Sequence, residues 1–500
     1  MTSILALDQG TTGSTALVIH QDGRVLGHGY REITQYFPQP GWVEHDPLEI
    51  LRLTVEAGRE AMARSGERPA GIGITNQRET VAVWDRRTLE PVAPAIVWQD
   101  RRTSERCRQL QADGLENDIR RRTGLVLDPY FSATKLEWLL TDRVIRARAV
   151  RGELAAGTID SWLIARLTGG RIHVTDHTNA SRTLLYGLES GDWDDGLLAM
   201  FGVPRELLPV CVPSSGVLGE ADAEFFGHVL PIAGVAGDQQ AALFGQGGAV
   251  PGRAKNTYGT GAFLLTCTGD RIARSGSGLL TTVACGPKGE RVFALEGSVF
   301  VAGAAIQWLR DALGVLASAA ESERLARSVS DTGGVHFVPA FTGLGSPHWE
   351  PEARGTITGL TRGTTRAHLV RAALEAMAFS SADLIDAMVK DAGMPITVLG
   401  VDGGASANEW LMQFQADLLG IPLERPDLVE TTALGAAGLA GLALGVWGSY
   451  EAFTGTRPRV RFLPAGNDEK RAALRAGWAR AVRAALAWAR PGALTVRKTS

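Results

Sequence analysis

Two short turns rich in glycine and threonine carry residue types that bind phosphate. One runs from Asp8 to Gly13, and the other is Gly259-Thr260-Gly261. Glycine lets the backbone approach an anion closely, and successive N–H groups with hydroxyls such as those of Thr11 and Thr12 can donate to phosphate oxygens. An ordinary polar hairpin turn explains the first turn by itself. Two such turns facing each other across a cleft would bind a triphosphate from both sides.

Two aspartates follow apolar runs and therefore end predicted strands. Asp8 follows Ile4–Leu7, and Asp238 follows the run 234–237. The first carboxylate is suited to hold Mg²⁺ through water, because Mg²⁺ keeps several of its water ligands. The second is a candidate general base for a hydroxyl group, a role worth about 10²–10⁴ in rate. Asp238 is also a good helix N-cap, and the sequence alone does not separate these two roles.

A third group of residues could bind a small polyol. Arg78 can donate to two oxygens and Glu79 can accept from two hydroxyls. Tyr130 would add a phenol, and Trp98 would add an aromatic wall. An exposed Arg–Glu ion pair on a loop is the simpler explanation of the first two residues.

The second half of the chain offers a place for a flat ring. The run from Val401 to Asn408 contains Gly403 and Gly404 and predicts a strand, a glycine turn and a helix start. Glycines there would let an adenine ring lie against the backbone, with the Asn408 amide available to it. A helix-capping turn explains the same residues without a ligand.

Charge and motifs exclude several classes of protein. The 500 residues carry 51 basic and 54 acidic side chains, a net charge of −3, so no basic surface for nucleic acid is indicated. The sequence contains no P-loop motif and no G-x-G-x-x-G dinucleotide motif. Any phosphate must therefore be bound locally, by backbone amides or by a metal. The 60 glycines are the compositional excess that such binding would use.

The sequence predicts a cytoplasmic protein without an integral membrane segment. Its four cysteines are widely spaced, which is typical of a reducing compartment, and the N-terminus lacks the pattern of a signal peptide. The run Thr431–Tyr450 has no charged residue and is long enough to span a bilayer. Its regularly spaced glycines make it weakly hydrophobic, and we expect a helix packed inside the protein.

The order of apolar and polar segments predicts an α/β fold made of two similar halves. A strand, a polar turn and a strand occupy residues 4–19, and the same layout returns at 255–265, with a third strand around 279–284. Helical periodicity is strongest at 299–313, 367–388 and 470–489, the last as an exposed amphipathic helix. We place the domain boundary near the glycines at 245–248, which predicts domains 1–246 and 247–500.

Five segments and two longer signatures occur in a fixed order. The segments are Asp8-Gln-Gly-Thr-Thr, Asn76-Gln-Arg-Glu-Thr, Gly237-Asp-Gln-Gln, Tyr258-Gly-Thr-Gly and Asp402-Gly-Gly, and the signatures are Tyr130-x-Ser-x-x-Lys-Leu-x-Trp-Leu and Gly355-x-Ile-x-Gly-Leu. Together they resemble the FGGY carbohydrate kinase family, and within it the glycerol kinases. The resemblance extends from about residue 3 to residue 447.

This resemblance implies an actin- and hexokinase-like fold, with two ribonuclease-H-like domains around a central cleft that closes on substrate. The implied reaction transfers phosphate from ATP to glycerol, giving sn-glycerol 3-phosphate, with Asp238 as general base and Asp8 orienting Mg²⁺. Arg78, Glu79, Tyr130, Asp238 and Gln239 would hold glycerol, with Trp98 and Phe263 packed on its carbon chain. Thr11, Thr12 and Gly13 would contact the phosphates, and the nucleotide site would be lined by Thr260, Gly303, Gln307, Gly404 and Asn408.

Two alternatives remain at this point. A related kinase of the same family would act on a pentulose or on gluconate. An actin-like ATPase would share the nucleotide site but would have no acceptor, and Asp238-Gln239 with the aromatic residues argue against it. A homo-oligomer, dimeric or tetrameric, is expected.

One departure from the family pattern can be tested directly. Many glycerol kinases carry arginine shortly after the first phosphate turn, where this chain has Thr15. We expect either weaker anchoring of the γ-phosphate or a replacement cation from elsewhere. Because arginine adds charge-assisted hydrogen bonds to phosphate, Thr15→Arg should lower KM for ATP or raise kcat. Steady-state kinetics in which both constants stay unchanged would contradict this expectation.

Overall fold

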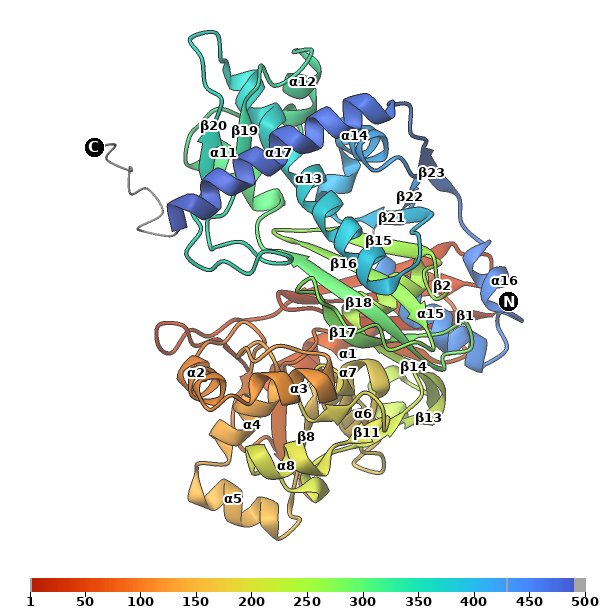
Figure 1. Cartoon of the computed structure of the whole chain (residues 1–500). Coiled ribbons are helices and arrows are strands. Elements are labelled where there is room, and N and C mark those ends of the chain that lie inside the picture. The colour runs from red at the N-terminus through yellow and green to blue at the C-terminus, as the bar shows by residue number, and fades with distance from the viewer. Residues whose placement is uncertain (1, 429, 490–500) are drawn as a thin grey trace.

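The computed structural model describes residues 2–428 and 430–489, which form two α/β halves, each built around one large sheet. Figure 1 shows the first half, red to yellow, below the second half, green to blue.

The sheet of the first half has six strands in the order β13-β14-β5-β1-β2-β3. Their bounds are β1 Ser3–Gln9, β2 Gly13–His20, β3 Val25–Glu32, β5 Ile72–Asn76, β13 Ser215–Ala221 and β14 Leu230–Gly237. The predicted hairpin is confirmed, since β1, β2 and β3 are antiparallel neighbours. β5 runs parallel to both β1 and β14, and Asn76 pairs with Gln9 on one side and Gly237 on the other. The carboxyl ends of these three strands therefore meet at one edge, where Asp8, Arg78 and Asp238 lie.

The sheet of the second half repeats this plan. Its order is β17-β18-β16-β15-β21-β22-β23, with bounds β15 Arg253–Tyr258, β16 Ala262–Gly269, β17 Leu280–Cys285, β18 Arg291–Val299, β21 Val398–Asp402, β22 Leu423–Pro426 and β23 Arg459–Phe462. β15 and β16 form the hairpin, and β21 is parallel to β15 as β5 is to β1. The strand predicted around 279–284 forms, but as the edge strand β17. β18 lies between it and β16, so here the repeat is not literal.

The remaining elements cover these sheets. One smaller sheet has four strands in the order β4 (Glu44–His45), β7 (Ala95–Ile96), β6 (Val81–Asp85) and β8 (Leu154–Thr158). Three further sheets have two strands each: β9 (Val174–Asp176) with β12 (Val210–Val212), β10 (Tyr186–Gly187) with β11 (Asp192–Trp193), and β19 (His336–Val338) with β20 (Thr356–Thr358). Helices of the first half are α1 Pro47–Ser65, α2 Ser104–Ala112, α3 Glu116–Thr123, α4 Ser132–Leu139, α5 Arg143–Val150, α6 Ile159–Leu167, α7 His177–Ala180, α8 Asp195–Phe201, α9 Ala223–Phe226 and α10 Asp238–Gly245. Those of the second are α11 Gly303–Asp311, α12 Glu321–Arg327, α13 Arg366–Ala392, α14 Glu409–Leu419, α15 Thr431–Ala443, α16 Tyr450–Thr454 and α17 Asp468–Ala489.

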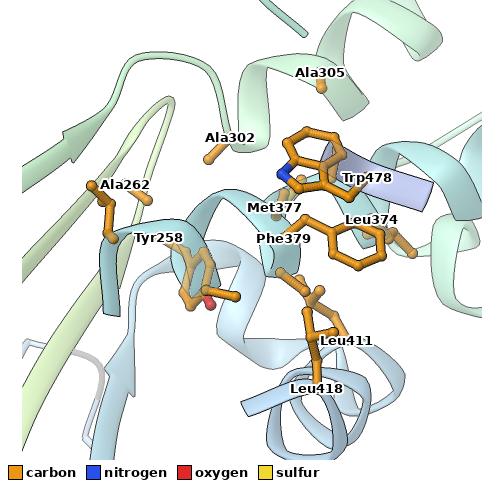
Figure 2. Packing of buried hydrophobic residues seen from close by; sticks show 14 of the residues in the cluster. Tyr258, Ala262, Ala302, Ala305, Leu374, Met377, Phe379, Leu411, Leu418 and Trp478 are labelled. Carbon is orange, nitrogen blue, oxygen red and sulfur yellow. The ribbon is translucent and has the colours of Figure 1, made fainter. Parts of the chain in front are cut away.

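The three helices predicted from periodicity all form, with differences at one start and in one exposed face. α13 and α17 match their predicted ranges closely, whereas the helix predicted at 299–313 begins only at Gly303, because Val299 pairs with Ala262 as the last residue of β18. α17 is not an exposed helix throughout. Trp478 is buried and stacks on Phe379 of α13, with ring centroids 5.2 Å apart (Figure 2).

Two helices cross between the halves. α10 follows β14 of the first half, yet Leu243 packs with Leu265 in the sheet of the second half. α15 follows β22 of the second half, yet Leu439 packs with Ile4 on the sheet of the first half, beside β1 in Figure 1. The expected buried helix in the uncharged run is thus confirmed as α15. Because each half contributes a helix to the other, the boundary between 246 and 247 stays a prediction.

No helix in residues 2–428 and 430–489 is long and apolar enough to cross a membrane.

The crossing of α10 and α15 is close at two glycines, Gly245 and Gly435, and it is tightest at Gly435. A Cβ on Gly435 would lie 1.8 Å from the carbonyl oxygen of Ala241, so a side chain there would push the helices apart. We expect Gly435→Ala to lower the free energy of unfolding by about 1–3 kcal/mol, the usual cost of overpacking a core, as measured by urea denaturation. Gly448→Ala is the control, because its Cβ would meet open space. Equal stability of both variants would contradict a close helix contact.

Candidate active site

The turn between β1 and β2 is closed by a backbone hydrogen bond and contacted by the side chain of Trp98. Gly10 N donates to Gly13 O at 2.9 Å, and Trp98 Nε1 donates to Thr11 Oγ1 at 2.8 Å. A Cβ on Gly13 would lie 2.6 Å from the Tyr30 hydroxyl, so glycine is needed there. The predicted phosphate-turn residues, Thr12 included, therefore occupy a rigid turn at the carboxyl end of β1, and Trp98 joins this turn to the predicted glycerol pocket.

The second turn packs against the start of α11. Gly259 N donates to Gly261 O at 2.8 Å, and Gly303 N donates to Gly259 O at 3.1 Å. A Cβ on Gly303 would lie 2.6 Å from that same oxygen, so only glycine allows the approach.

A cavity of about 520 Å³ opens beside this turn. Thr260, Gly303, Gln307, Gly404 and Asn408, the predicted nucleotide residues of the second half, all line it. A Cβ on Gly404 would meet nothing within 4 Å, so the backbone faces open space, as a flat ring would require.

Two features of this cavity bear on the sequence analysis. Asn408 also caps α14, since its Oδ1 accepts from Leu411 N at 2.9 Å, so the capping and lining explanations both hold. The apolar side chains of Ile306, Leu374 and Met377 complete the wall. The sequence analysis did not identify them, because apolar residues on a helix look the same in a core and in a ligand site.

A buried ion-pair network joins the two halves at the predicted polyol site. Arg78 Nη1 lies 2.6 Å from Glu296 Oε2, and Arg182 bridges Glu296 Oε1 at 2.8 Å and Glu79 Oε1 at 2.7 Å. Arg78 Nη2 also donates to the Tyr130 hydroxyl at 3.3 Å. Arg78 and Glu79 are 3% and 1% exposed, which overturns the explanation of an exposed loop pair. Glu79 has a φ of +62°, a left-handed conformation that is strained for a non-glycine residue.

The sheet of the second half determines which residues meet this network. Leu265 pairs with Lys255 on one side and Glu296 on the other, so all three side chains share one face. Phe263 lies two residues along and shares the face as well. This is the face toward α10 and the first half.

Electrostatics keep Glu296 ionised in spite of its burial. Burial alone would raise its pKa, but Arg182 and Arg78 lower the pKa to about 2. The carboxylate therefore adds stability that is present above the unfolded pKa, near 4.5, and is lost only as the pH falls toward 2.

Asp238 faces the network at the start of α10. Its Oδ1 lies 3.1 Å from Arg78 Nε and accepts from Gln239 N at 2.7 Å. Gly237 occupies the N-cap position, so Asp238 is the first residue of the helix and not its cap. Its side chain is 31% exposed, in contrast to the buried groups around it. The carboxylate is therefore oriented by a buried guanidinium and accessible to a ligand.

The aromatic and amide residues of the predicted pocket are only partly connected. Trp98 and Tyr130 meet edge to face, with ring centroids 5.5 Å apart. Gln239, in α10 of the first half, accepts a hydrogen bond from Lys255 Nζ, in β15 of the second half. Phe263 lies on the sheet face that carries Glu296, without a ring contact to Trp98 or Tyr130.

Asp8 lies on the face of β1 toward α15, where the Thr432 hydroxyl donates to it. Burial, with the charges of Asp238 and Glu430, raises the pKa of Asp8 to about 7. Such a site favours a cation. Within the described part of the chain, no three His, Cys, Asp or Glu side chains come together as a metal-ligand group. The donor set therefore fits Mg²⁺ held by a carboxylate together with phosphate oxygens and water. Thr15 lies directly opposite Asp8 in the β1–β2 ladder.

Comparison with known proteins identifies the family. A model of the N-terminal domain of the FGGY family of carbohydrate kinases matches residues 3–245, and a model of the C-terminal domain matches residues 254–444. The chain belongs to the FGGY family of carbohydrate kinases. This FGGY kinase is 55% identical over 492 residues to a glycerol kinase of Carboxydothermus hydrogenoformans, covering 97% of this chain and 98% of the relative. It is 57% identical over 498 residues to a glycerol kinase of Trichlorobacter lovleyi, covering 98% and 100%.

A solved structure confirms the fold class of this FGGY kinase. The structure of Plasmodium falciparum glycerol kinase with ADP superposes with a TM-score of 0.93 at 36% identity, covering 97% of this chain and 98% of that chain. The two α/β halves are thus the two actin- and hexokinase-like domains of the family.

Besides the apolar residues of the cavity wall, the sequence did not predict three charged residues of this candidate site: Arg182, Glu296 and Lys255. A weak signal existed for Glu296, a lone charge after the apolar run 292–295. No local pattern shows that it meets Arg78, 218 residues earlier in the chain.

The network predicts a large loss of stability when its central charge is removed. Glu296→Gln keeps the size of the side chain but leaves Arg78 and Arg182 short of a counter-charge. Breaking a buried pair in this way costs about 3–5 kcal/mol, which urea denaturation would measure. Glu189→Gln is the matched control, since its 2.7 Å pair with Arg274 also links the halves but is 72% and 44% exposed. The control should lose less than about 1 kcal/mol, and losses of equal size would argue against a buried network.

Proposed function

We propose that this FGGY kinase catalyses ATP-dependent phosphorylation of glycerol to sn-glycerol 3-phosphate. The curated relatives described above, each covered over almost the full chain, are named glycerol kinase. The single observation that carries the proposal in this chain is the placement of Asp238 against Arg78, beside the buried Glu79 and Tyr130. That arrangement places groups that can hydrogen-bond to glycerol hydroxyls next to an accessible carboxylate that can act as a base.

Glycerol would be held by fixed polar groups. The network holds both charged side chains in place before substrate arrives. The Arg78 guanidinium already donates to Glu296, Gln240, Tyr130 and Asp238, so a glycerol hydroxyl would have to share one of these donors, whereas Glu79 is paired only through Oε1 and keeps Oε2 for a hydroxyl. Preorganised groups do not lose side-chain freedom on binding, which favours a small and weakly hydrophobic ligand. Tyr130 and Gln239 would complete the hydroxyl contacts, while Trp98 and Phe263 would pack on the carbon chain.

ATP would lie in the cavity of the second half, with its phosphates toward the two glycine turns. Thr260, Gly303, Gln307, Gly404 and Asn408 line that cavity, and Gly404 leaves room for a flat ring. Thr11, Thr12 and Gly13 would donate to the phosphates from the opposite turn. Asp8 would hold Mg²⁺, which when bound neutralises charge on the phosphate oxygens.

Asp238 would act as the general base. The glycerol hydroxyl attacks the γ-phosphorus of ATP, a new O–P bond forms, the bond to the ADP oxygen breaks, and the hydroxyl proton passes to an Asp238 oxygen. Arg78 holds that carboxylate through Nε, which keeps it aimed at the acceptor. Phosphoryl transfer needs positioning and charge neutralisation more than covalent chemistry by the protein, and the groups named above would supply both.

Three further inferences accompany this function. The domain boundary is placed between residues 246 and 247. The protein is cytoplasmic. It forms a homo-oligomer, dimeric or tetrameric.

The decisive experiment is ATP consumption measured with glycerol, with no acceptor, and with a pentulose or gluconate. We expect turnover with glycerol alone, and Asp238→Asn should lower kcat by about 10²–10⁴, the usual worth of a general base. The variant should keep its nucleotide affinity, because Asp238 does not line the adenine cavity. Preference for a sugar acceptor would indicate a related kinase, and acceptor-independent turnover would indicate an ATPase.

A further inference from the structure

Lys255 is a buried cation that the proposed mechanism does not use. It lies in β15 with no exposed surface, and its Nζ donates to Gln239 Oε1 and, at 2.9 Å, to Thr257 Oγ1. Both acceptors are uncharged. In the described residues no carboxylate lies within ion-pair distance of Lys255, although Arg78, Arg102 and Arg182 each have one or more. A buried ammonium without a close counter-ion is costly and calls for a functional reason.

The contact determines which way the Gln239 amide points. An ammonium carries three donors and no acceptor, so only the amide oxygen of Gln239 can face it. The Nε2 group must then point away from Lys255. It makes no hydrogen bond to any residue in the described part of the chain, whereas the neighbouring Gln240 uses both amide ends, Nε2 to Val283 O at 3.1 Å and Oε1 to Arg78 Nη1 at 3.3 Å. Gln239 is thus held with a free donor beside Asp238.

We propose that Lys255 is a positioning residue that fixes the Gln239 amide with its NH₂ toward the acceptor, so that Gln239 can only donate to a glycerol oxygen. This inference rests on the proposed function. It adds a recognition element, because the acceptor must offer a lone pair at that position, as a hydroxyl oxygen does. Lys255 comes from the second half and Gln239 from the first, so the amide is oriented only when the halves are packed as they are here.

The environment of Lys255 makes the contact sensitive to pH. Burial, with a smaller contribution from Arg78, lowers the pKa of Lys255 to about 8, although Asp402 of β21, Asp238 of α10 and Glu296 of β18 act in the opposite direction. A neutral amine can accept as well as donate, so above this pH either end of the Gln239 amide can face it. The free donor is then no longer guaranteed, and glycerol affinity should fall as the pH rises.

Calorimetric titration of the full chain with glycerol, without nucleotide, tests the proposal. Lys255→Met should raise Kd for glycerol about tenfold, since the loss approximates one oriented hydrogen bond. In a Gln239→Ala background the same substitution should have no further effect. Arg253→Met is the control on the same strand: it removes a cation paired with Glu424, which keeps Arg459 and Arg461, and it should leave Kd unchanged.

The pH series gives a second readout that a purely structural role would not move. Wild-type Kd should rise above about pH 8, and this rise should be absent in Lys255→Met and in Gln239→Ala. Gln239→Ala keeps the test valid if Lys255→Met does not fold. It also shows whether the pH effect comes from Lys255 or from Lys135, another buried lysine with its pKa lowered to about 8. The proposal would be overturned if a folded Lys255→Met variant bound glycerol like wild type, or if the rise in Kd above pH 8 persisted in Gln239→Ala. Failure of the proposed function is distinguishable, because wild type would then show no glycerol-dependent ATP turnover.

Discussion

The Glu296 carboxylate, buried between two guanidinium groups of the other half, is the constraint on which the site depends. An isolated buried charge is strongly unfavourable, so Arg78 and Arg182 need a counter-charge that does not rely on solvent. Glu79 supplies part of it from the first half, and Glu296 supplies the rest from β18 of the second. The charges of the proposed polyol site are therefore balanced only when both halves are in contact. Ligand recognition and the packing of the halves share the same atoms.

At the two turns proposed to bind phosphate, backbone N–H groups take the place of a basic surface. The chain is almost neutral, and its two turns offer N–H groups and hydroxyls in place of a cluster of lysines and arginines. Glycine is required there for reasons of space: side chains at Gly13 and Gly303 would overlap neighbouring atoms. The same property serves a different purpose at Gly435, where it lets α10 and α15 cross closely. Part of the glycine excess is thus explained by close approach within the protein, and part by faces left open to a ligand, as at Gly404.

The two halves share a plan but use it differently. In the first, the helix after the third parallel strand begins with Asp238, which faces Arg78 and the proposed acceptor position. In the second, the equivalent helix α15 begins with Thr431 and Thr432, whose hydroxyls donate to Asp402 and Asp8. One helix start therefore presents a base, and the other holds two carboxylates at the ends of β21 and β1. Divergence at equivalent positions of a shared framework would account for the proposed separation into an acceptor side and a nucleotide side.

The sequence by itself determined the family, the α/β class, the two hairpins and most residues of the site, because these depend on local patterns: apolar runs, glycine turns and ordered motifs. It also identified Arg78, Glu79 and Asp238 as candidates, but from the local residues alone a structural explanation of each was the simpler one. Only the tertiary structure removed those explanations, by burying Arg78 and Glu79 and by giving the N-cap position to Gly237. The same holds for Glu296, Arg182 and Lys255. Their roles come from contacts between residues far apart in the chain, and the cost of burying a charge becomes apparent only when its partners are in place.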